Sequence, residues 1–173
     1  MSAIISSCGA YRYRLERKLG PISIPAITAA IIMVNPSTAD AETDDATIRK
    51  LRGFGERNGW SKIIVGNLFA YRATDVRELA SAADPIGPDN DDHLGRIIGE
   101  ADELIFAWGP TGKLPLRFRS RWTVARDLAA ALDRVPQSIG PTAQDGHPCH
   151  PLMLGYSTPL RPWLGPELSK LMQ

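Results

Sequence analysis

The sequence has few cysteines and no pattern that would build a metal centre. Its 173 residues include only two, Cys8 and Cys149, and their spacing matches no metal-binding motif. We therefore expect neither a disulfide framework nor an iron–sulfur cluster, and no metal ion or other cofactor. A reduced, cytoplasmic location is the expectation for such a chain.

Long apolar runs and a strong charge imbalance are lacking too. No stretch approaches the roughly 20 apolar residues that span a bilayer, and the N-terminus lacks the basic and apolar regions of a secretory signal. The net charge is +1 at pH 7, so composition alone does not indicate a nucleic-acid-binding protein. We expect no membrane partner, and the oligomeric state is left open.

Three familiar catalytic patterns are absent. The sequence contains no Gly-x-Ser-x-Gly, no phosphate-cradling Gly-Lys-Thr loop and no paired Cys/His cluster of the metal-binding type. These absences argue against the usual serine hydrolases, NTPases and zinc enzymes.

Apolar strand patterns alternate with helical stripes along the chain. A helix is expected to begin near Asp44 or Asp45 and to end at Gly59. The alternation from residue 27 onward is typical of a parallel sheet covered on both faces. We predict one α/β domain over residues 1–173, a three-layer α/β/α arrangement with a central, mostly parallel four-stranded sheet plus an N-terminal β-hairpin. The expected strands cover residues 10–16, 27–34, 62–67, 103–108 and about 150–155.

Polar residues follow several of these strands. Asn35, Asn67 and Trp108 each come at or just after a strand end, and His147 and His150 lie in a Pro-rich segment near the C-terminus. Because the carboxyl ends of parallel strands meet at one edge of a sheet, we expect these side chains to converge there.

The segment after Asn35 has two interpretations. Asn35-Pro36-Ser37-Thr38 could hold a water or a ligand amide, or it could be a plain turn between strand and helix. The acidic run over residues 40–45 could likewise hold Mg²⁺ or supply a general base. It could also be a solvated loop with an Asp cap.

Asn67 and the residues after it suggest a base-binding site. A buried Asn must be satisfied, and the edge of a nucleobase can satisfy it. Phe69 and Tyr71 could stack on a base or simply pack in the core. A neutral imidazole at His147 or His150 could donate to a developing oxyanion, and the other histidine of the pair would then be structural.

Residues 111–126 form a basic segment without an acidic residue, in which Phe118 and Trp122 are interleaved. Such a segment could contact phosphates, or it could be a solvated loop whose arginines pair with nearby acids. Its basic residues are Lys113, Arg117, Arg119, Arg121 and Arg126.

Five motifs carry a resemblance that covers almost the whole chain. This combination resembles a bacterial and phage family of unknown function (domain of unknown function 1643), which implies no activity. The motifs are Tyr11-Arg12-Tyr13-Arg14-Leu15-Glu16-Arg17, Asn35-Pro36-Ser37-Thr38-Ala39-Asp40, Asn67-Leu68-Phe69-Ala70-Tyr71-Arg72-Ala73-Thr74, Ala107-Trp108-Gly109 and Gly146-His147-Pro148-Cys149-His150-Pro151-Leu152.

The order of these motifs is also similar to that of the uracil-DNA glycosylase superfamily, in its mismatch-specific branch. That resemblance implies that Asn35 places the hydrolytic water and that Asn67 reads the Watson–Crick edge of a flipped base. His147 or His150 would contact the base oxygen. Leu152 would be the wedge that enters the duplex.

The leading hypothesis is therefore a metal-independent DNA glycosylase that hydrolyses the N-glycosidic bond of a flipped uracil, mismatched or modified base. One alternative is a non-catalytic module that binds a nucleotide or modified base. Another is a Mg-dependent enzyme acting on free nucleotides. The base, and the choice between DNA and RNA, stay open. Contacts to DNA, single-stranded or modified DNA included, are expected from Ser37, Thr38, Lys113, Arg117, Arg119, Arg121 and Leu152.

Overall fold

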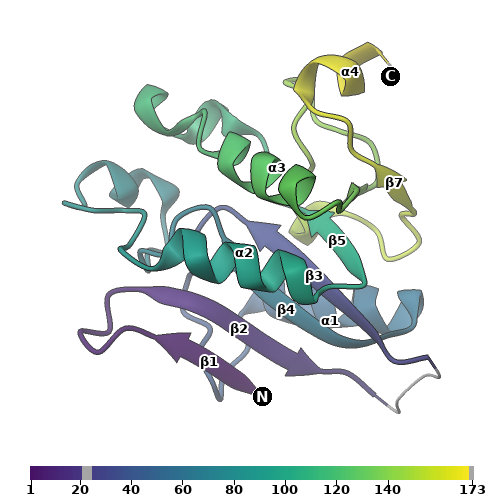
Figure 1. Ribbon diagram of the computed structural model, residues 1–173, viewed down its shortest axis with the longest axis horizontal. Coiled ribbons are helices and arrows are strands. Elements are labelled where there is room, and N and C mark those ends of the chain that lie inside the picture. The colour runs from purple at the N-terminus through teal and green to yellow at the C-terminus, as the bar shows by residue number, and fades with distance from the viewer. Residues whose placement is uncertain (21–24, 172–173) are drawn as a thin grey trace.

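The computed structural model describes residues 1–20 and 25–171, which form a mixed α/β fold (Figure 1). The strands in chain order are β1 (Ser2–Ile5), β2 (Arg12–Lys18), β3 (Ile27–Met33), β4 (Trp60–Asn67), β5 (Glu103–Phe106), β6 (Pro136–Ile139) and β7 (Leu160–Pro162). The α-helices are α1 (Ala46–Asn58), α2 (Asn90–Glu100), α3 (Trp122–Ala131) and α4 (Pro166–Leu171). Short 3-10 helices are η1 (Val76–Ala80), η2 (Thr111–Lys113), η3 (Leu116–Phe118) and η4 (Pro151–Met153).

Within the described residues the strands form one sheet in the order β1-β2-β4-β3-β5-β6-β7. The strands β4, β3, β5 and β6 pair in parallel. At the sides of the sheet, β1, β2 and β7 pair antiparallel with their neighbours. The mixed α/β class is confirmed. The prediction of a four-stranded sheet is wrong, because the N-terminal strand pair and β7 extend one sheet to seven strands.

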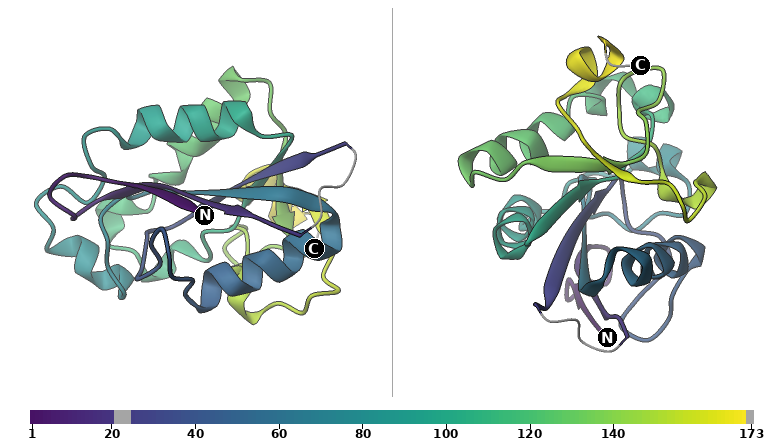
Figure 2. Two further views of the ribbon diagram at one scale, coloured as in Figure 1. Left: turned by 90° about the horizontal axis from the view of Figure 1, so that it is seen from below. Right: turned by 90° about the vertical axis from the view of Figure 1, so that its right-hand side faces the viewer.

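Buried side chains cover both faces of the sheet. Along β3, Ala29, Ile31 and Met33 belong to the core under α1, whereas Ala30 and Ile32 belong to the core under α2 and α3. Figure 2 shows α1 on one face and α2 on the other. Each fully buried aliphatic side chain stabilises such a core by about 1.5–3 kcal/mol. The faces are therefore held together by strands that are apolar on both sides, as expected for buried parallel sheet.

The parallel pairing brings the functional strand ends together. Met33 at the end of β3 lies opposite Asn67 at the end of β4, and Ile32 lies opposite Phe106 at the end of β5. The N-terminus of α1 follows β3 through the loop over residues 34–45. In α1 the Asp45 side chain accepts from Ile48 N, as local capping chemistry predicts.

The prediction of a strand at about residues 150–155 is wrong. That segment forms η4, which begins at Pro151; proline lacks the N–H that strand pairing needs. The strand beside β5 is instead β6, Pro136–Ile139, whose sequence Pro-Gln-Ser-Ile has no apolar alternation. Its strand conformation depends on pairing with β5 and β7, which no local pattern records.

No helix within the described residues has both the length and the apolar character needed to cross a membrane.

Candidate functional site

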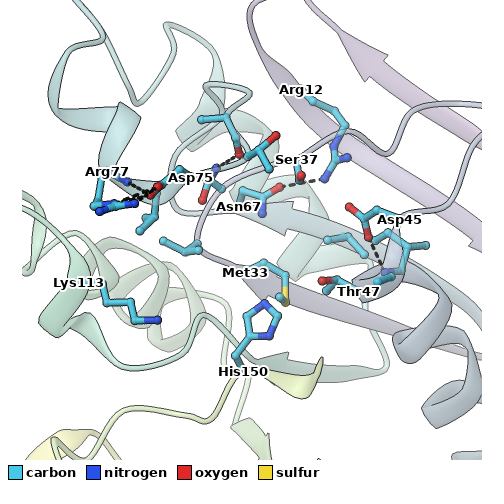
Figure 3. Close-up of a pocket in the computed structure, with 18 residues that line it drawn as sticks. Arg12, Met33, Ser37, Asp45, Thr47, Asn67, Asp75, Arg77, Lys113 and His150 are labelled. Atoms are coloured by element: carbon cyan, nitrogen blue, oxygen red, sulfur yellow. Dashed lines mark hydrogen bonds and ion pairs between the residues drawn. The ribbon is translucent and has the colours of Figure 1, made fainter. Parts of the chain in front are cut away.

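A cleft of about 890 Å³ opens at the carboxyl ends of β3 and β4, beside the N-terminus of α1 (Figure 3). Its wall combines apolar groups with side chains from loops far apart in the sequence. The polar and charged side chains that line it are Arg12, Asn35, Ser37, Asp45, Thr47, Asn67, Thr74, Asp75, Arg77, Lys113 and His150.

Asn67 is buried at the floor of this cleft, with 2% of its surface exposed. Its Oδ1 accepts from Arg12 Nη2 at 3.5 Å, and no partner for its Nδ2 is found in the described part of the chain. The Asn90 side chain donates to the backbone carbonyls of Asn67 and Leu68 at 3.0 and 3.1 Å. The Asn90 side chain therefore holds the backbone at the end of β4 in place. The Nδ2 of the Asn67 side chain keeps two free donors.

Arg12 was not predicted as a site residue, yet it is buried in the cleft wall. Burial lowers its pKa to about 10. It donates to the backbone carbonyl of Ala39, and its Nε has no partner among the described residues. The signal available in the sequence was a basic residue at the start of an alternating strand, which cannot by itself distinguish a buried arginine from an exposed one.

Asn35 follows the end of β3 by two residues and lines the cleft. Its Nδ2 donates to Ala73 O at 2.7 Å and to Pro36 O at 3.2 Å, so the amide nitrogen holds the neighbouring loop in place. Its Oδ1 has no hydrogen-bond donor among residues 1–20 and 25–171. This oxygen is available to accept a hydrogen bond from a water molecule.

The two histidines of the C-terminal motif are separated by the fold. His150 lines the cleft, and its Nδ1 accepts from Leu152 N at 3.3 Å. The proton of the neutral ring is therefore on Nε2, and burial lowers the pKa of His150 below its ordinary value. His147 lies outside the cleft lining, with its Nδ1 accepting from Trp108 Nε1 at 3.3 Å and its ring against Trp122. Trp108 is thus a core residue rather than a cleft residue.

The two residues expected to stack on a base are not in the cleft lining. Phe69 is fully buried in the core under α2 and α3, with its ring 5.3 Å from that of Phe118. Tyr71 is half-buried and packs edge-on against Tyr11. The apolar surface that lines the cleft next to Asn67 comes from Met33 and other aliphatic residues.

Of the expected nucleic-acid-binding residues, Ser37 and Lys113 line the cleft. Thr38 is exposed outside the lining. Leu152 lies in η4, two residues after His150, and is 42% exposed.

Three arginines of the basic segment form hydrogen bonds or ion pairs with other parts of the protein. Arg117 donates to Ala80 O, Arg119 donates to Leu114 O and Gly112 O, and Arg121 donates to Leu68 O and pairs with Asp91. Arg117 and Arg119 remain exposed and keep their charges at the surface.

The acidic run has structural partners. Asp40 accepts from the backbone N–H of Glu42 and Thr43. Asp44 pairs with the buried Arg17 and with Arg52. In the described residues, no group of three or more His, Cys, Asp and Glu side chains is placed to hold a metal ion.

Most of the chain, with all of the polar cleft residues, matches the model of one protein family. The model of the family described as "Protein of unknown function (DUF1643)" matches residues 12–152, from Arg12 in the cleft wall to Leu152 in η4. Neither a curated protein nor a solved structure matches the chain significantly. The matched range spans all the polar cleft residues named above and most of the chain, and the protein therefore belongs to the DUF1643 family.

Proposed function

We propose that this protein is an N-glycosyl hydrolase that binds a flipped nucleobase in the cleft. The observation that carries the proposal is that Asn35, Asn67 and His150, from three distant segments, line one cavity. These are the positions to which the resemblance to the uracil-DNA glycosylase superfamily assigns the water, the base edge and the base oxygen. The cavity volume, about 890 Å³, falls in the usual range of small-molecule sites, about 300–1,000 Å³.

Recognition of the base rests on Asn67. Its Nδ2 offers two donors with no partner among the described residues, and a donor that a bound base covers without pairing costs about 1–3 kcal/mol. A base whose edge presents an acceptor removes that cost. The face of the base contacts aliphatic groups of Met33, Val65 and Val76, which line the cleft where an aromatic ring was expected.

Bond cleavage uses the other two residues. The Asn35 Oδ1 accepts a hydrogen bond from the attacking water and turns its oxygen toward the deoxyribose C1′. The His150 Nε2–H donates to the departing base, whose negative charge grows as the bond to C1′ breaks. A preorganised donor of this kind is typically worth about 3–4 kcal/mol of barrier. Because an Asn cannot accept a proton, the water needs a base elsewhere for fast turnover.

DNA is the proposed partner. Lys113 lines the cleft, and the exposed Arg117 and Arg119 follow it along the same loop. Their hydrogen bonds to backbone carbonyls leave the positive charges in place, and phosphate binding depends on such charges.

The test is an excision assay in EDTA. Oligonucleotides carrying uracil, mismatched and modified bases are incubated with the protein and then cleaved with alkali at abasic sites. We expect strand breaks at one lesion, and we expect Asn67→Ala and Asn35→Ala to abolish them. The matched control is Asn58→Ala, since Asn58 donates only to Phe54 O at the end of α1, outside the cleft lining.

Intact strands with every base would contradict the hydrolase. Saturable binding of an oligonucleotide without product would then favour the alternative of a non-catalytic base-binding module. Activity that appears only with Mg²⁺ would favour the enzyme on free nucleotides, although Asp40 and Asp44 already have partners in the fold.

A further inference from the structure

The cleft holds one carboxylate whose second oxygen has no partner. Asp45 Oδ1 accepts from Ile48 N at 2.8 Å and so caps α1. No partner for Oδ2 is found among residues 1–20 and 25–171. Figure 3 shows this oxygen turned toward the interior of the cleft, on the side of Asn67 and Ser37.

The other groups in the cleft that could accept a proton are occupied. Both oxygens of Asp75 accept from the Arg77 guanidinium, and this pairing, the largest cause, lowers the Asp75 pKa to about 2. His150 uses Nδ1 to accept from Leu152 N, and its Nε2 carries the proton. Asp45 is therefore the cleft-lining base that remains open among the described residues.

The charge of Asp45 affects two other residues that line the cleft, Arg12 and His150. Burial lowers the pKa of Arg12 to about 10, and the nearby Asp45 carboxylate opposes that shift. Burial likewise lowers the pKa of His150, again opposed by Asp45. The Asp45 carboxylate therefore lies near enough to both Arg12 and His150 to affect the charge of each.

We propose that Asp45 is the general base of the reaction, an inference that rests on the proposed N-glycosyl hydrolase function. The water held by Asn35 gives one proton to Asp45 Oδ2 as its oxygen bonds to C1′. The C1′–N bond breaks, and its electron pair leaves with the base, which His150 Nε2–H stabilises. The base then takes a proton from solvent and Asp45 releases its proton to solvent, so the sum is the addition of one water.

A substitution can separate the role of Asp45 as the cap of α1 from its role as the general base. Asn caps a helix as well as Asp does, because its Oδ1 accepts the same backbone N–H. It cannot accept a proton. Asp45→Asn therefore keeps the N-terminal cap of α1 and removes the proton acceptor together with its charge.

The experiment measures single-turnover excision in EDTA together with the free energy of unfolding. Asp45→Asn should lower the rate about 10²–10⁴-fold, the usual contribution of general-base catalysis, with unfolding unchanged. The matched control is Asp40→Asn, which removes the same charge from the same loop. An Asn at position 40 still accepts from Glu42 N and Thr43 N, so its excision rate should equal that of the wild type.

A second variant tests for the base chemically. Asp45→Ser keeps a capping hydroxyl and leaves room for a small carboxylate, so added formate should restore part of the lost rate. A purely structural role for Asp45 would not respond to formate.

The outcomes separate the two proposals. Excision by Asp45→Asn at the wild-type rate overturns the assignment of Asp45 and leaves the hydrolase standing. Loss of excision in Asp45→Asn with no response of Asp45→Ser to formate also overturns it. A wild-type protein that excises no base overturns both.

Discussion

Arg12 Nη2 donates to Asn67 Oδ1 over 3.5 Å, and this pairing decides which side of the Asn67 amide faces the cleft. A guanidinium carries donors and no acceptor, so only the amide oxygen can face it. The Nδ2 donors are then the part of the Asn67 amide that stays unpaired among the described residues. The cleft is built to meet an acceptor, such as a base carbonyl oxygen under the proposed function.

Phe69 should behave as a core residue and not as part of the ligand site. Phe69→Ala is expected to lower the free energy of unfolding by about 3–5 kcal/mol, because it leaves a cavity beside Phe118. The milder Phe69→Leu should keep the wild-type excision rate. Urea denaturation and single-turnover kinetics check both statements. Loss of excision in a stable Phe69→Leu variant would restore the stacking role.

Asn90 should prove to be a support for Asn67. Asn90→Ala removes the donors to Asn67 O and Leu68 O and should cost about 1–3 kcal/mol of unfolding free energy. Because the end of β4 then loosens, oligonucleotide affinity should fall as well. Asn58→Ala is the comparison, since it removes a single contact near the surface. Equal denaturation midpoints for the two variants would contradict the prediction.

Gly146 should be intolerant of a side chain. Its φ is +79°, and an added Cβ would lie 2.1 Å from the backbone oxygen of Pro166. Gly146→Ala therefore combines an unfavourable backbone conformation with a clash that no side chain can relieve, at a cost above about 3 kcal/mol.

Gly9→Ala is the matched control for Gly146→Ala. Gly9 has a φ of +74° but nothing within 4 Å of an added Cβ, so only the conformational cost of about 1 kcal/mol applies. Thermal or urea denaturation of both variants gives the comparison. Similar losses of unfolding free energy in the two variants would show that the backbone at Pro166 can move away from the added Cβ at little cost.

The pH dependence of stability should report on His150. Burial lowers its pKa in the folded state below the ordinary 6.5. Below pH 6.5 the unfolded chain takes up a proton that the folded protein resists, so the stability contributed by a neutral His150 is complete above that pH and is lost as the pH falls.

The measurement is the free energy of unfolding of wild type and His150→Gln between about pH 7 and about pH 5. The variant should lose less stability over that interval. His93, whose pKa is also lowered by burial, is present in both proteins and cancels in the difference. Parallel curves would show that His150 is not buried as described.

Local chemistry predicted the parts of the fold that depend on neighbouring residues. The Asp45 cap and the Gly59 stop of α1 follow from side-chain and backbone preferences within a few positions. The placing of Asn35 and Asn67 at strand ends was predictable from apolar runs. The short β6 and β7 were not, because Pro-Gln-Ser-Ile and Leu-Arg-Pro become strands only through their pairing.

The sequence by itself determined that polar groups follow two apolar strand patterns and that a capped helix follows the first. Tertiary structure alone decided that His150 reaches the cleft while His147 packs against Trp108, and that Phe69 is buried. It also brought Arg12 beside Asn67. The reason is physical: capping and strand preference are set by residues close in the chain, whereas burial and pairing depend on segments that meet only in the packed fold.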